Sequence, residues 1–183
     1  TSYNSYLLKN QREGLLIDTA DPSKKEEFFQ KLEESEVEKI SYIVAQHAEQ
    51  DHSGCIGEVL KKFPDCKVIT NRKCLELLID ELHLKEESFI EIKDSEVFNF
   101  GKHKMQFIFA PWVHWPETFL TYLPQEKILF TCDLFGSHLA SSELWSEDNI
   151  TNYLAAKRYY AEIMMPFRKN IGKHLQKLKE IEI

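Results

Sequence analysis

Apolar positions along the chain follow two periods, one typical of strands and one typical of helices. The apolar β-type run 40–45 is followed by Ile56, Val59, Leu60 and Phe63, which recur at helical spacing. The pattern predicts a buried strand, a polar loop and then a helix that ends before Pro64.

The same patterns predict the rest of the chain. Helices are expected over 22–34, over 71–80 behind an Asn71 cap, and from Ile150 onward with a break at Pro166 near Met165. Strands are expected over 5–8, 14–18, 66–70, 89–92, 97–100, 105–110, 119–123 and 127–132. Strands alternating with helices early, and hairpins later, favour an α/β sandwich with sheets inside and helices outside.

Composition narrows the class of protein. The chain has 183 residues, a formal net charge of −7 and 43% hydrophobic residues, which suits one globular domain. The acidic balance argues against nucleic acid or an anionic membrane as the main partner. The four cysteines form no CxxC pair, so we expect reduced thiols and a cytoplasmic protein, with Cys132 as a small apolar residue at a strand end.

The loop after the first buried strand is rich in metal-ligand side chains. His47, Glu49, Asp51 and His52 lie within residues 47–52. In an extended segment, residues i, i+2 and i+4 project to one side, so these side chains can converge. Four such ligands suit two metal ions, and imidazole with carboxylate suits iron, manganese or zinc. The alternative is a polar loop in which Asp51 or Ser53 caps the following helix.

Two later segments can complete such a site. His114 lies in a rigid, apolar loop between two tryptophans and two prolines, and Asp133 ends the last predicted hairpin. Taken alone, His114 reads as a packed histidine and Asp133 as a turn residue. Beside the first block, both are candidate metal ligands.

The motifs H-x-E-x-D-H-x-G, P-W-x-H-W-P and D-x-F-G-S-H together resemble those of the flavodiiron proteins, the diiron branch of the metallo-β-lactamase fold. The resemblance implies a metallo-β-lactamase-like αββα sandwich over residues 1–183. It implies that the first iron is held by His47, Glu49, His114 and Asp133, and the second by Asp51, His52 and the shared Asp133. In parts of the family the residue matching His52 turns away from the metal. Asp18 resembles a residue that supports the metal loop.

The resemblance also implies a cofactor and partners. Two iron ions with an oxo, hydroxo or peroxo bridge would bind dioxygen or nitric oxide, inside a pocket walled by Trp112, Trp115 and Phe135. Electrons would come from a flavin protein or rubredoxin, and FMN would sit on a domain or partner outside this chain, typically across a homodimer. No catalytic residue beyond the metal ligands is implied.

Two departures from the family pattern stand out. The family's flavodoxin-like domain is absent from these residues. The family's last His ligand for the second iron follows a strand, and here such a strand is expected to begin at Glu180, so that His would come after Ile183. We therefore expect a diiron domain that is incomplete at both ends.

Three functions follow from this reading. The leading one is the catalytic core of an oxygen or nitric oxide reductase. The protein would act as an oxidoreductase only if an electron-donor domain or partner exists. The second is a non-catalytic diiron oxygen sensor that signals to a partner such as chemotaxis machinery. The third is a zinc hydrolase using metal-bound hydroxide, against which Glu49 argues, because zinc hydrolases of the superfamily have His at that position.

Overall fold

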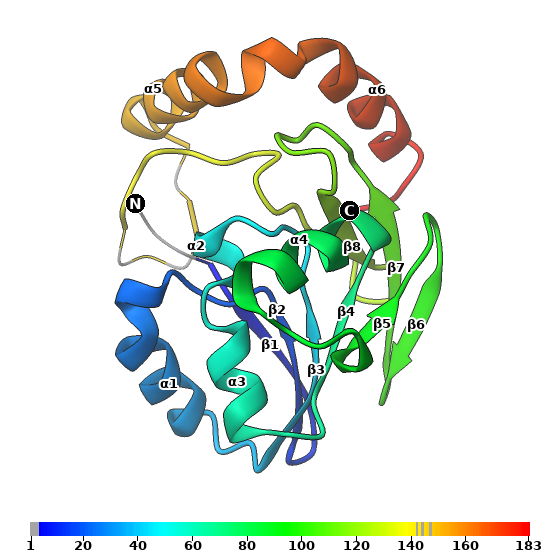
Figure 1. Ribbon diagram of the computed structural model, residues 1–183. Helices are drawn as coiled ribbons and strands as arrows, with labels where there is room; N and C mark the ends of the chain where they lie inside the picture. Colours follow the sequence, from blue (N-terminus) through cyan, green and yellow to red (C-terminus); the bar gives the residue numbers. More distant parts are fainter. Residues whose placement is uncertain (1–3, 142, 144, 147) are drawn as a thin grey trace.

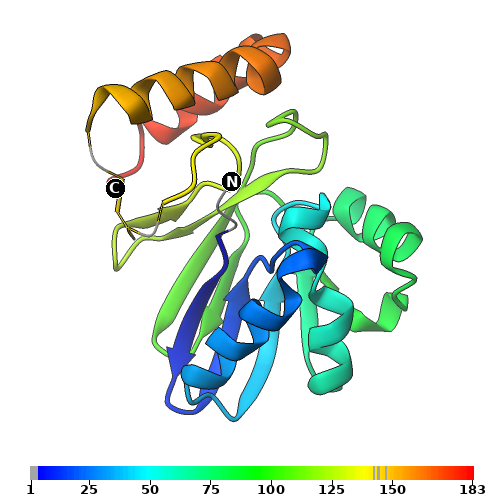
Figure 2. The same cartoon turned by 90° about the vertical axis from the view of Figure 1, so that its left-hand side faces the viewer.

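The computed structural model describes residues 4–141, 143, 145–146 and 148–183. Its elements stack in four layers, with two sheets between two sets of helices (Figures 1 and 2). This arrangement confirms the αββα sandwich predicted from the sequence.

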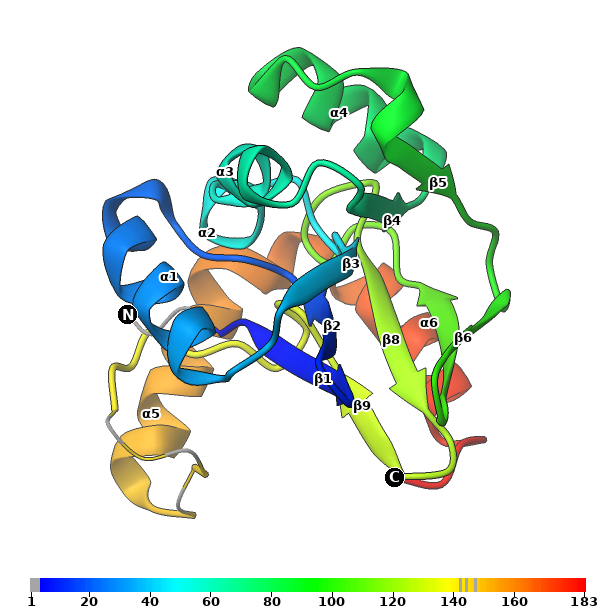
Figure 3. The same cartoon turned by 90° about the horizontal axis from the view of Figure 1, so that it is seen from below.

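The first sheet has the strand order β1 (Tyr6–Asn10), β2 (Glu13–Ile17), β3 (Lys39–Val44), β4 (Lys67–Thr70) and β5 (Phe89–Glu91). The first two strands form an antiparallel hairpin, and β2 to β5 run parallel. Parallel neighbours need crossover connections, and these are the helices α1 (Lys25–Glu34), α3 (Ile56–Lys62) and α4 (Arg72–Leu82). Figure 3 shows the three helices along the outer face of this sheet.

The second sheet is antiparallel throughout. Its strands follow chain order as β6 (Val97–Phe100), β7 (His103–Phe109), β8 (Phe119–Leu123) and β9 (Ile128–Phe130). Its outer face is covered by α5 (Ile150–Tyr159) and α6 (Arg168–Leu178), which form an arch in Figure 1. Between the two helices lie the irregular turns Tyr160–Met164 and Met165–Phe167. The break predicted at Pro166 is therefore confirmed, since proline lacks the N–H that a continuous helix needs.

Strand alternation sorts apolar side chains into separate cores. On β2, Leu15 and Ile17 pack between the two sheets, whereas Leu16 faces the helices of the first sheet. On β8, Phe119 points between the sheets and Leu120 toward α5 and α6. Successive strand residues point to opposite faces, so each sheet is apolar on both sides.

The strand ends position the polar residues. Asp18, the loop from Ala45 and Asn71 follow the carboxyl ends of β2, β3 and β4, which lie at one edge of a parallel sheet. Loops 110–118 and 131–136 follow β7 and β9 of the second sheet. Ligand sites of open α/β sheets lie outside this carboxyl edge.

Three details differ from the sequence prediction. The helix expected up to Phe63 is divided into α2 (Gln50–Ser53) and α3. The strands expected in succession over 89–92 and 97–100 belong to different sheets, and the turn at Asp94–Ser95 lies between them. The expected strand from Glu180 is not formed, and Glu182 instead accepts a hydrogen bond from the Tyr122 hydroxyl at its carbonyl oxygen. Within the described part of the chain, no helix is long and apolar enough to cross a bilayer.

The core between the sheets supplies a stability prediction. Phe107 is fully buried there and packs edge-on against Phe119 with ring centroids 5.7 Å apart. Phe107→Ala should lower the free energy of unfolding by about 3–5 kcal/mol, because it removes apolar contacts and leaves a cavity. Val97→Ala, on an exposed position of the same sheet, should change it by less than about 0.5 kcal/mol. Urea unfolding measures both, and equal losses would contradict the assignment of this core.

Candidate metal centre

Four donor side chains converge at the carboxyl edge of the first sheet. His47 lies in the loop after β3, Glu49 precedes α2, His114 lies in the loop after β7, and Asp133 follows β9. The ligand atoms of these four side chains all lie within 4.8 Å of one another. The imidazole Nε2 atoms of His47 and His114 each lie 3.2 Å from Glu49 Oε2.

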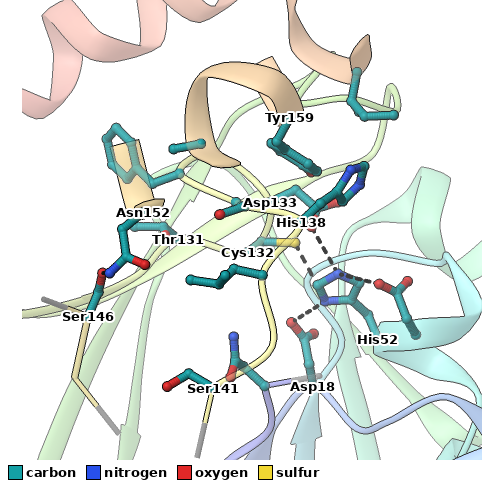
Figure 4. Close-up of a pocket in the computed structure, with 18 of the residues that line it drawn as sticks. Asp18, His52, Thr131, Cys132, Asp133, His138, Ser141, Ser146, Asn152 and Tyr159 are labelled. Atoms are coloured by element: carbon teal, nitrogen blue, oxygen red, sulfur yellow. Dashed lines mark hydrogen bonds and ion pairs between the residues drawn. The ribbon is translucent and has the colours of Figure 1, made fainter. Parts of the chain in front are cut away.

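Asp133 is the side chain on which two groups of donors meet. Its Oδ2 lies 3.5 Å from Nε2 of both His47 and His114. Its Oδ1 lies 3.2 Å from His52 Nε2, which is also 3.7 Å from Asp51 Oδ2. One carboxylate thus presents a different oxygen to each group of histidines, as Figure 4 shows for His52.

Two histidines are fixed by hydrogen bonds from the ring nitrogen that points away from Asp133. His47 Nδ1 lies 2.7 Å from Oε1 of Glu117, which also accepts the Ala48 N–H. His52 Nδ1 lies 3.0 Å from Asp18 Oδ2. Such carboxylate partners set the ring orientation and leave Nε2 available as a ligand.

Side-chain hydrogen bonds from Asp18 and Asn71 tie the metal loop and the His114 loop to the first sheet. Asp18 Oδ1 accepts the Gln46 backbone N–H at 2.8 Å, so β2 and the metal loop are linked directly. Asn71 donates its side-chain N–H to the Glu117 carbonyl and accepts the Cys74 N–H as the cap of α4. The metal loop and the His114 loop are therefore held by neighbouring strand ends of the first sheet.

The charged groups shift one another's pKa values. Burial lowers the pKa of His47, but hydrogen bonds to Glu117 and Glu49 outweigh it and raise the pKa to about 9. Hydrogen bonds from His114 and His47 hold the pKa of Glu49 well below its usual range. Burial raises the pKa of Asp51, which carries a buried Oδ1 that has no hydrogen-bond partner among the described residues. A divalent ion held by these carboxylates and imidazoles would take the place of protons on the histidines.

The donor set fits a pair of divalent metal ions. Imidazole nitrogens and carboxylate oxygens converge here, and among the described residues no Arg or Lys takes part in the ion pairs that they form. The unpartnered Asp51 oxygen is a ready ligand, and the tethered rings of His47 and His52 are pre-oriented. Nitrogen and oxygen donors of this kind suit iron, manganese or zinc.

A pocket of about 650 Å³ opens over these residues. Its aromatic lining comes from Tyr6, Phe135, Trp145 and Tyr159, and His138 also lines it. The prediction that Trp112 and Trp115 form its walls was wrong. Trp115 packs edge-on against His47, and Trp112 remains exposed and stacks on Phe167 with ring centroids 5.8 Å apart.

The structure therefore brings together His47, Glu49, His114 and Asp133. It places His52 at the other oxygen of Asp133, and Asp51 lies beside His52. Asp51 lies in the first turn of α2, so the expected extended spacing holds only as far as Glu49. His52 is turned inward, toward Asp133, in this arrangement. Asp18 has the contacts expected of a residue that supports the metal loop.

Sequence reasoning missed two residues and misplaced one. Glu117 is fully buried against His47, and its signal was an acid in an otherwise apolar loop. Gln46 is buried beside Asp18, and nothing in the sequence marked it. The helical context of His174 in the sequence predicts a surface position, but His174 is buried and bonded to the Pro111 carbonyl, because α6 packs over the His114 loop.

Comparisons with known proteins identify the family and the fold of this chain. A family model described as ODP family beta lactamase matches residues 1–183. The anaerobic nitric oxide reductase flavorubredoxin of Aliivibrio fischeri is 35% identical over 185 residues, which cover 99% of this chain and 36% of that protein. A flavodiiron protein from Giardia intestinalis superposes with a TM-score of 0.91 at 30% identity, over 99% of this chain and 45% of that one.

The rubredoxin oxygen:oxidoreductase of Desulfovibrio gigas also has this architecture. It superposes with a TM-score of 0.88 at 27% identity, over 97% of this chain and 45% of that one. The chain thus spans less than half the length of each of these relatives.

The geometry predicts a graded loss of metal binding. His47→Ala, His114→Ala or Asp133→Ala should each weaken metal binding by more than about a hundredfold, because each removes a donor. Glu117→Ala should weaken it by about 10–100-fold, as expected for loss of a partner that orients a ligand. His52→Ala should remove one of two ions. Competition with a chelator measures these affinities, and exposed His83→Ala is the control. Loss of metal from His83→Ala equal to that from His114→Ala would contradict the assignment.

Proton competition predicts how metal binding depends on pH. Below a pH of about 9 the metal-free His47 holds a proton, which an incoming ion must displace. Metal affinity should therefore rise at least tenfold per pH unit below about pH 9 and rise less steeply above it. Anaerobic titration with ferrous iron against a chelator at several pH values checks this. An affinity that does not change with pH over this range would contradict it.

Proposed function

Because the chain belongs to the family described as ODP family beta lactamase, we propose that it forms the diiron core of a reductase for nitric oxide or dioxygen. In this proposal His47, Glu49, His114 and Asp133 hold the first iron, and Asp51, His52 and Asp133 hold the second. The resemblance to flavodiiron proteins noted from the sequence is confirmed by the relatives described above.

The observation that carries the proposal is the orientation of Asp133. Its two oxygens face separate histidine groups, 3.5 Å from His47 and His114 and 3.2 Å from His52. A single-ion site would need only one of these oxygens. A carboxylate placed between two donor sets supports two ions close enough to act on one small molecule.

The donor chemistry supports iron over zinc. Glu49 provides a carboxylate oxygen where zinc hydrolases have an imidazole, and Asp51 and Asp133 add further oxygens. Oxygen-rich donor sets favour harder ions and stabilise the higher charge that iron reaches on oxidation. A zinc hydrolase is therefore the less favoured reading of this site.

The names of the relatives support the choice of substrate. One is called an anaerobic nitric oxide reductase and another a rubredoxin oxygen:oxidoreductase. Two ferrous ions, when bound, would supply two electrons to a small molecule held between them. A donor must then replace those electrons, and we propose that it is a flavin or rubredoxin carried by a partner or by a domain outside these residues.

The chain's own residues would control access and orientation. Asp18 and Glu117 hold the rings of His52 and His47 from behind. Phe135 and Tyr159 line the pocket above Asp133, and burial raises the pKa of the Tyr159 hydroxyl well above its usual range. The Tyr159 hydroxyl, protonated at neutral pH like that of an ordinary tyrosine, can donate a hydrogen bond.

The proposal predicts turnover that depends on an electron donor. Anaerobic ferrous protein should consume nitric oxide or dioxygen once and then stop, since the described residues contain no rubredoxin-type cysteine cluster. Adding reduced rubredoxin or a reduced flavin protein should restore steady consumption. His114→Ala should lower the rate by at least about a hundredfold, as loss of a metal ligand would. Gas-electrode traces measure both rates.

The same gas-electrode traces distinguish a reductase from a non-catalytic oxygen sensor. A reductase gives sustained consumption with a donor and loses it in His114→Ala but not in His83→Ala. An adduct with dioxygen or nitric oxide that persists for minutes in the presence of reduced donors would overturn the reductase proposal. Iron-independent ester hydrolysis by zinc-loaded protein would overturn it as well.

A further inference from the structure

We propose that Asp18, His52 and Cys132 form a binding site for a zinc-class divalent ion, at the Nδ1 atom of His52 rather than at the Nε2 atom that faces Asp133. This site is separate from the four-donor cluster of His47, Glu49, His114 and Asp133. Its distinguishing feature is a sulfur donor.

The three donors already surround one point. His52 Nδ1 lies 3.0 Å from Asp18 Oδ2 and 3.8 Å from Cys132 Sγ, and all three atoms are within 4.8 Å of one another. Figure 4 shows the Cys132 sulfur and the Asp18 carboxylate both directed at the His52 ring. They come from three distant parts of the chain, after β2, within α2 and after β9.

These separations match those expected around a tetrahedral zinc ion. Zinc bonds of about 2.3 Å to sulfur and about 2.0–2.1 Å to nitrogen or oxygen put a nitrogen roughly 3.3 Å from an oxygen and roughly 3.5 Å from a sulfur. The observed distances of 3.0 and 3.8 Å lie on either side of these values. Small side-chain rotations are enough to close the site.

A buried oxygen beside the cluster has no partner. Gln46 is 1% exposed, and its Oε1 makes no hydrogen bond to any described residue. Its Nε2 donates to Asp18 Oδ2 at 3.2 Å, which places the amide next to the site. Gln46, Asp18, His52 and Cys132 all line the same pocket. A flip of the Gln46 amide would exchange its nitrogen and oxygen and direct the oxygen at the site. That oxygen or a water from the pocket can complete a four-ligand site.

The sulfur donor makes this site chemically different from the proposed iron sites, whose donors are nitrogen and oxygen. Thiolate favours zinc and related ions, whereas carboxylate-rich sets favour harder ions. Both sites use His52, one through Nδ1 and the other through Nε2. An ion on Nδ1 replaces the hydrogen bond from His52 to Asp18 that orients the ring, so its occupancy would change how His52 faces Asp133. The site itself does not rest on the proposed function, because its three donors need no iron nearby.

Cobalt gives a direct test, because a cobalt–thiolate bond produces a near-ultraviolet charge-transfer band that nitrogen and oxygen ligands do not. Excess cobalt added to the metal-free protein should produce this band. Cys132→Ser should abolish it, and Asp18→Asn should weaken cobalt binding at this site by at least about tenfold, as loss of a ligand does. Cys66→Ser is the matched control, since Cys66 is buried at the far end of β4, and it should keep the band.

Absence of the band in the wild-type protein would overturn the proposal and show that Cys132 is only a hydrogen-bonded thiol. Persistence of the band in Cys132→Ser would overturn it too. X-ray absorption of the zinc-loaded wild-type protein provides a measurement that needs no variant. It should show one sulfur at about 2.3 Å, and a spectrum with only nitrogen and oxygen neighbours would contradict the site. Neither measurement depends on iron or on reductase activity, so both are independent of the proposed function.

Discussion

The imidazole–carboxylate pair is the interaction on which this site depends. His47 pairs with Glu117 behind it and with Glu49 in front, and His52 pairs with Asp18 behind and Asp133 in front. Buried carboxylates are costly unless positive charge faces them. Without metal, protons on the histidines supply that charge, as the raised pKa of His47 indicates. Metal ions can take over the same role, so one arrangement serves both states.

The fold supplies the rigidity that this balance needs. Asp18, the His47 loop and Asn71 follow adjacent parallel strands, and the His114 and Asp133 loops come from the second sheet. The site is therefore built across the two sheets, whose shared core includes Phe107 and Phe119. The α6 residue His174 bonds to the Pro111 carbonyl and links the outer helix layer to the His114 loop.

Much of this could be predicted from the sequence, because the ligands of the first block are local and the strands have clear periods. The positions of His47, Glu49, His114 and Asp133 follow from motifs that need no tertiary information. The roles of Glu117 and Gln46 could not be predicted, since both depend on contacts between loops from different strands. The prediction that Trp112 and Trp115 form the pocket walls was wrong for the same reason. Whether Trp112 faces the site or the helix layer is decided by its stacking on Phe167, far along the chain.

The central claim is that this chain holds two iron ions that share Asp133. Anomalous diffraction from crystals of iron-loaded protein, measured on both sides of the iron and zinc absorption edges, tests it most directly. The account predicts two iron peaks, one among His47, Glu49 and His114 and one beside Asp51 and His52, with Asp133 between them. A single peak, or two peaks that follow the zinc edge in protein loaded with iron alone, would contradict it.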